Sequence, residues 1–166
     1  TGIYPYSMMT STFLPFSKGD HSIYISSSSQ EWCGHTFMTL KNTGKNFNIA
    51  LDSYFDAESK ENIPIEKCIL EDDLWSMIRI NPEKLPQGSH KVLPSFFYLR
   101  LRHKEAKATE ALLQLKKEEE QYTYTVVYPS LNRNLEIHFS LDFPYQIQGW
   151  TESYSSGFGS AQKVLK

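Results

Sequence analysis

Apolar and polar residues alternate over much of the chain, which is the pattern of strands with one buried face. Between residues 46 and 55 one face of the predicted strand carries Phe47, Ile49, Leu51 and Phe55, and the other carries Asn46, Asn48 and Asp52. Two later segments repeat the pattern, the first with Tyr122, Tyr124, Val126 and Tyr128 and the second with Leu135, Ile137 and Phe139. Antiparallel sheets with one solvated face show this period, so we expect a mainly β fold.

A helical period interrupts the alternation near residue 70. Acidic residues at 71–73 suit the positive end of a helix dipole, and Asn81-Pro82 is a stop signal. From residue 70 onward an apolar stripe recurs at spacings of three and four, formed by Leu70, Leu74, Met77 and Ile78. The pattern predicts one helix over 70–79, which would cover an open face or end of the sheet.

Other segments give weaker signals. Residues 3–16 are β-prone but contain two prolines, and proline cannot donate to a ladder, so we expect an edge strand or two short pieces of strand there. Residues 56–64 are polar and predict a loop. Residues 96–103 alternate and predict a strand. Residues 104–120 have the composition of a helix but also alternate, and we interpret them as a strand between strands. A short strand should end at Trp150.

These elements predict a curved antiparallel sheet or incomplete barrel with one covering helix. With 166 residues the chain can bury one substantial core. We expect a single β-rich domain over 1–152, followed by a loosely ordered Ser/Gly-rich tail over 153–166.

Composition excludes several classes of function. The net charge is -2, so we expect no nucleic-acid partner, and the chain should be peripheral to a membrane at most. The residues show no metal-binding signature, and we expect no cofactor. The two cysteines, Cys33 and Cys68, are too few for a disulfide scaffold, although one bridge between them is possible.

The most suggestive chemistry lies in residues 23–40, where we expect a strand, a polar serine run and a second strand. Trp32-Cys33-Gly34-His35 matches the start of a thioredoxin-type site, but the resolving cysteine is replaced by Thr36, which argues against dithiol exchange. On a strand, the Cβ atoms of Cys33 and His35 would lie roughly 7 Å apart. This is too far for a direct hydrogen bond between the thiol and the imidazole. We therefore favour a structural cysteine and a histidine at the sheet rim.

Two further features have a functional and a structural interpretation. The serines at 26–29 could form an anion-binding nest, but the glycines of such loops are missing, so a solvated turn is favoured. Arg100, Arg102 and Lys104 form a basic stripe beside Tyr98. The stripe could bind phosphates or acidic partners, although the solvent face of an amphipathic strand is the favoured explanation.

Several segments together resemble a poorly characterised family of Gram-negative envelope proteins, some of which carry the label "septum formation inhibitor Maf". The matching segments are SSSSQEWCGH (26–35), ILEDDLW (69–75), PSFFYLRLRHKE (94–105), YPSLNR (128–133) and FPYQIQGWTE (143–152). The resemblance implies a longer precursor and a location in the periplasm or at the outer membrane. The Ser-x-Ser-Pro-Arg-Arg loop of Maf-type pyrophosphatases is not matched, because the serines at 26–29 run into Gln30-Glu31. The late hairpins are similar to β domains of the lipoprotein-carrier type.

Our leading hypothesis is a non-enzymatic envelope protein that binds an apolar ligand or a partner protein on its curved sheet. The candidate binding residues are Trp32, Tyr98, Arg100, Arg102 and Tyr124. One alternative is a cysteine-dependent hydrolase that uses Cys33 with His35 or another histidine. A second alternative is a structural interaction module that docks by a sheet edge.

Overall fold

A computed structural model describes residues 5–16, 20–32, 34–54, 59–155 and 162–165. The chain divides into two compact units, and helix α1, Glu71–Ile80, spans the division in the sequence. The first unit comprises Thr1–Asp73 and Leu93–Ala108, and the second comprises Leu74–Val92 and Thr109–Lys166. The mainly β class with one main helix is confirmed. The single domain over 1–152 stays a prediction.

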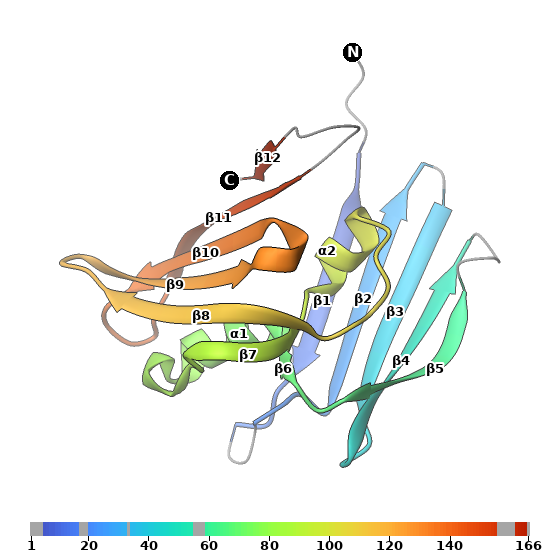
Figure 1. Ribbon diagram of the computed structural model, residues 1–166, viewed down its shortest axis with the longest axis horizontal. Helices are drawn as coiled ribbons and strands as arrows, with labels where there is room; N and C mark the ends of the chain where they lie inside the picture. The colour runs from blue at the N-terminus through green and yellow to red at the C-terminus, as the bar shows by residue number, and fades with distance from the viewer. Residues whose placement is uncertain (1–4, 17–19, 33, 55–58, 156–161, 166) are drawn as a thin grey trace. The chain divides into compact units, whose positions relative to one another are not determined.

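The first unit contains a five-stranded antiparallel sheet in the order β1-β2-β3-β4-β5 (Figure 1). The strands are β1 (Ser7–Phe13), β2 (Tyr24–Glu31), β3 (Gly34–Asn42), β4 (Asn46–Ser53) and β5 (Lys60–Glu66). The edge strand predicted within 3–16 is confirmed as β1, and the alternating segment from residue 46 is β4. The predicted loop at 56–64 is wrong from Lys60 onward, because β5 begins there and pairs with β4.

The serine run is part of β2 and not a solvated turn, which corrects the prediction. Ser27 lies opposite Thr10 of β1 and Met38 of β3, and its Oγ accepts a 2.8 Å hydrogen bond from the Thr10 hydroxyl. Ser27 and Ser29 are buried, together with Ile25 on the same side of the strand. We call this side of the sheet its inner face.

Helix α2, Phe96–Leu101, packs against β1 and β2 (Figure 1). The strand predicted over 96–103 is therefore wrong. Ser95 caps the helix by accepting a hydrogen bond from the Tyr98 amide, and an Asp72 carboxylate accepts one from the Phe96 amide. These caps satisfy amide groups that the first turn leaves without partners.

The second unit is a six-stranded antiparallel sheet that curls into a half-barrel (Figure 1). Its strands are β7 (Gly88–Leu93), β8 (Thr109–Lys117), β9 (Gln121–Tyr128), β10 (Arg133–Ser140), β11 (Ile147–Ser155) and β12 (Gln162–Leu165), in the order β12-β11-β10-β9-β8-β7. Short 3-10 turns at Pro82–Lys84 and Pro129–Leu131 complete the connections, and the two-residue strand β6 (Ile69–Leu70) precedes α1.

Several predictions for the second unit are confirmed. The ambiguous segment at 104–120 contains β8, and the predicted helix is α1. The tyrosine and aliphatic sets of β9 and β10 are buried, except for partly exposed Tyr122. Trp75 of α1 contacts Trp150 of β11 edge-to-face, with ring centroids 5.7 Å apart. The last predicted strand does not end at Trp150, because β11 continues to Ser155.

Candidate functional site

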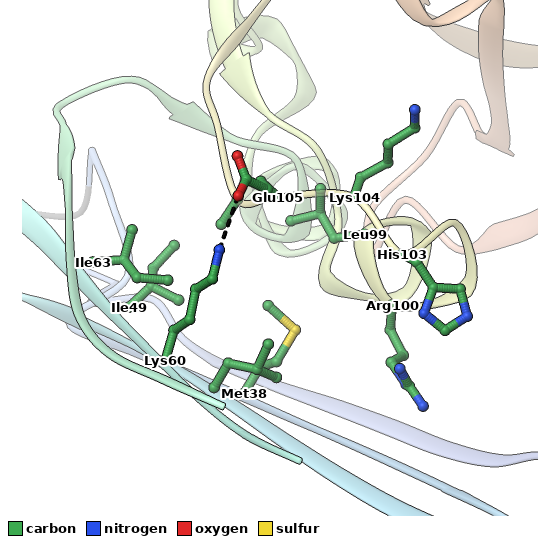
Figure 2. A pocket seen from close by; sticks show the side chains of 11 residues that line it. Met38, Ile49, Lys60, Ile63, Leu99, Arg100, His103, Lys104 and Glu105 are labelled. Carbon is green, nitrogen blue, oxygen red and sulfur yellow. Dashed lines mark hydrogen bonds and ion pairs between the residues drawn. The ribbon is translucent and has the colours of Figure 1, made fainter. Parts of the chain in front are cut away.

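The first unit contains a pocket on the inner face of its sheet, beside the part that α2 covers. The cavity has a volume of about 340 Å³. Strands β3, β4 and β5 form its floor, and the end of α2 with the chain that follows forms its other wall (Figure 2). Its aliphatic lining consists of Met38, Ile49, Leu51, Ile63 and Leu99, and its polar lining of Lys60, Arg100, His103, Lys104 and Glu105, beside Ala106.

The strand register brings the floor residues together. Met38 lies opposite Leu51 in the β3–β4 ladder, and Ile49 lies opposite Ile63 in the β4–β5 ladder. Directly opposed residues share a face and have their Cβ atoms about 5 Å apart. Met38 and Ile49 are buried, while Leu51 and Ile63 are half-buried. The floor is thus a continuous aliphatic surface that remains partly open.

A bulge in β5 places a lysine at the mouth of this pocket. The register shifts between Ile49 and Leu51, so that Lys60 and not Glu61 lies opposite Leu51. The backbone of Asn62 is left-handed, with φ 57°, a conformation that asparagine tolerates better than most residues. The Asn48 side-chain amide donates a 3.0 Å hydrogen bond to Asn62 Oδ1. Bulges re-aim side chains in this way beside binding sites.

The end of α2 forms the opposite wall through a Schellman motif. The Lys104 amide donates to the Leu99 carbonyl at 2.9 Å, and the His103 amide donates to the Arg100 carbonyl at 3.2 Å. His103 occupies the left-handed position of the motif with φ 47°, where glycine or asparagine is usual. The motif reverses the chain and places Lys104, Glu105 and Ala106 along the pocket.

An ion pair connects the two walls. Lys60 Nζ lies 2.8 Å from Glu105 Oε1, and the two side chains point toward each other (Figure 2). The hydrogen bond and positive charge of Lys60 lower the pKa of the Glu105 carboxyl. Both side chains are exposed, by 51% and 83%. An ion pair of this exposure contributes little to stability because water screens it, so an incoming ligand can replace either partner at small cost.

Arg100 is held differently. Its guanidinium lies 2.8 Å from Glu31 Oε1, and the two side chains are only 11% and 14% exposed. The pair ties α2 to the end of β2. The sequence predicted a strand with Arg100, Arg102 and Lys104 on one face, and this prediction is wrong. Arg100 lies in α2, Arg102 is the C-terminal cap of the helix, and Lys104 follows it.

The structure brings some predicted site residues together and separates others. Arg100 lines the pocket. Trp32 follows Glu31, the ion-pair partner of Arg100, and is 76% exposed in the β2–β3 turn. Tyr98 is buried in α2. Tyr124 belongs to the second unit, where it is fully buried and its hydroxyl donates a 2.6 Å hydrogen bond to the Pro86 carbonyl. Burial raises the pKa of Tyr124.

The cysteine hypothesis lies mostly outside the described residues, because Cys33 is not among them. His35 is exposed on β3, and its carbonyl accepts a hydrogen bond from the Tyr54 amide. A Cβ on Gly34 would come within 2.8 Å of the Tyr54 Cβ. Any larger residue at position 34 would therefore clash with Tyr54. Cys68, the other cysteine, is buried.

The sequence did not single out Lys60, Ile63, Leu99 or His103 as site residues. Lys60 and Ile63 fell in a predicted loop, and the bulge that unites them has no strong sequence signal. Leu99 and His103 fell in a predicted strand. Pro94-Ser95 is a helix-start signal that could have identified α2 and hence the pocket wall.

The described residues contain no cluster of three or more histidine, cysteine or acidic side chains arranged to hold a metal ion. In the same residues, no helix has the length and apolar character needed to cross a membrane. Comparison of the chain with protein-family models, with curated proteins and with solved structures finds no match. The envelope resemblance therefore stays a prediction.

Proposed function

We propose that the first unit binds an apolar ligand in the pocket over β3, β4 and β5, and that the protein acts by binding and not by catalysis. The observation that carries the proposal is the cavity of about 340 Å³ with five aliphatic side chains in its lining. Apolar surface that stays open in a folded domain commonly marks a binding site. The cell envelope is the location we propose with it, on the sequence resemblance alone.

The cavity size limits the ligand. Pockets for drug-sized molecules have volumes of roughly 300–1,000 Å³, and this cavity is at the lower end of that range. One short alkyl or acyl chain suits the space better than a whole two-chain lipid. Each buried methylene would contribute about 0.8 kcal/mol.

Methyl NMR provides the test. The chain has four methionines, of which Met38 lines the pocket and Met77 lies in the second unit. With ¹³C-labelled methionine methyls, octanol should shift the Met38 signal in a saturable way and leave Met77 in place. Ile63→Trp fills the cavity and should abolish the response, whereas Ile23→Trp, at an exposed site, should retain it. An unchanged Met38 signal at saturating octanol would reject the proposal.

Edge docking is the second candidate, supported by β1. This strand ends the sheet order, and Met9 and Phe13 in it are 65% and 52% exposed. An exposed edge can pair with a strand of a partner protein. Met9→Lys should then weaken capture of the partner without changing octanol binding. Equal capture by the unchanged protein and by the Met9→Lys variant would argue against edge docking. The hydrolase alternative stays a prediction.

A further inference from the structure

We propose that the ligand is an amphiphile, an alkyl chain that ends in an anion, and that Lys60 binds this anion after Glu105 is displaced. The inference rests on the proposed function, since it names the ligand class of the same pocket. It predicts that the head group of the ligand, and not only its apolar chain, determines affinity.

The distribution of charge over the pocket supports this class. Four of the five aliphatic side chains line the floor and the fifth, Leu99, comes from α2, whereas the charged side chains come from β5, α2 and the chain that follows α2. Three cations, Lys60, Arg100 and Lys104, and one carboxylate, Glu105, are in the lining. Arg100 is already engaged by Glu31 in a nearly buried pair, and the Lys104 side chain points away from Lys60 (Figure 2). Lys60 is thus the cation best placed to receive a ligand.

The partner of Lys60 shows what it can bind there. The Glu105 carboxylate sits 2.8 Å from Nζ at the edge of an apolar cavity, so an internal carboxylate already occupies the position that a ligand head group would take. Because both side chains are exposed, exchange of one carboxylate for another costs little. The bulge at Asn62 matters here, since a regular ladder would place Glu61 opposite Leu51 and repel an anion.

The binding would be an exchange of hydrogen-bond partners, with no covalent step. The ligand anion accepts hydrogen bonds from the Lys60 ammonium, Glu105 turns to solvent, and the alkyl chain covers Met38, Ile49 and Ile63. Charge-assisted hydrogen bonds are stronger than neutral ones, which is why an anionic head group should be preferred to a hydroxyl.

The experiment compares octanoate, octyl phosphate and octanol, three probes with the same chain, by titration of the Met38 methyl signal. In the unchanged protein the two anions should bind about fivefold tighter than octanol. Lys60→Met keeps the aliphatic stem and should lower the ratio of anion to octanol affinity from about fivefold to about one. Glu105→Gln removes the internal competitor and should tighten octanoate binding about threefold. Lys45→Met and Glu66→Gln, exposed substitutions in the same unit outside the lining, are the matched controls.

The outcomes separate the two proposals. Equal affinity for octanol and octanoate, or an anion preference that survives Lys60→Met, would overturn the inference and leave the apolar pocket standing. Failure of octanol and both anions to bind would overturn both proposals. A preference for octyl phosphate over octanoate would indicate a phospholipid-type head group, and the reverse a fatty acid.

Discussion

Lys60 and Ile63 lie on the same face of β5 although they are three positions apart, an odd spacing that puts residues on opposite faces of a regular strand. The extra residue of the bulge restores the common face, and the left-handed backbone of Asn62 accommodates it. The local conformation of one asparagine therefore determines that a lysine, and not a glutamate, stands at the pocket mouth.

Substitution of Asn62 should reveal this dependence. Asn62→Val forces a β-branched residue into the left-handed region and should lower the free energy of unfolding by about 1–2 kcal/mol. Asn62→Gly adopts the conformation freely and should lose less than about 0.5 kcal/mol. Urea unfolding of both variants measures the difference, and equal stabilities would show that the backbone at this position is not restrictive.

The buried serines of β2 should tolerate smaller side chains and not larger ones. Ser27→Leu adds volume below α2 and should cost about 1–3 kcal/mol of stability. Ser28→Leu, on the opposite face of the strand, is the matched control and should cost much less. Ser29 Oγ is buried and makes no hydrogen bond with the described residues, so Ser29→Ala should be neutral or stabilising. Thermal unfolding of the three variants tests the assignment of the inner face.

The Glu31–Arg100 and Lys60–Glu105 ion pairs of the first unit should differ in strength. Glu31→Gln removes the nearly buried pair with Arg100 and should cost about 3 kcal/mol, because a desolvated charge loses its counter-ion. Glu105→Gln removes an exposed, solvent-screened pair and should leave the unfolding midpoint close to that of the unchanged protein. Denaturant midpoints measured at two salt concentrations check this. A similar loss in both variants would mean that the Arg100 pair is solvated.

Stability should depend on pH through His21. Burial, and then the positive charge of Lys67, lower the pKa of His21 below 6.5. The folded state therefore binds fewer protons than the unfolded state below that pH, and stability should rise as the pH increases to 6.5. His21→Gln removes this contribution, while Asp73 and Asp20, which oppose the shift, remain in both proteins. Urea unfolding as a function of pH should show a wild-type advantage that grows up to pH 6.5 and then levels off. An advantage that shrinks with rising pH would contradict the assignment.

The spacing of apolar residues, together with the residues that begin or end an element, was sufficient to predict those elements in which one physical effect dominates. The alternation of β4, β9 and β10 and the stripe of α1 predicted their types correctly. In α2 the short run after Phe96 fits either period, and the caps at Ser95 and Asp72 decide in favour of helix. Asp72 lies far from α2 in the sequence, so the local pattern of apolar and polar residues could not show that it caps this helix.

The serine run and the pocket were harder for a different reason. Serine favours turns in isolation, whereas here Ser27 and Ser29 are buried on the inner face of β2, a strand against which α2 packs. The pocket residues come from β3, β4, β5 and the end of α2. Their proximity depends on strand register and on a bulge, neither of which is encoded in a local pattern.

The most direct measurement is the location of a bound alkyl chain by intermolecular nuclear Overhauser effects between octanol and labelled protein methyls. We expect contacts to the Met38 and Ile49 methyls in the first unit and none to Met77 or Ile137 in the second. Contacts confined to the second unit, or no contacts at saturating octanol, would contradict a binding pocket over β3, β4 and β5.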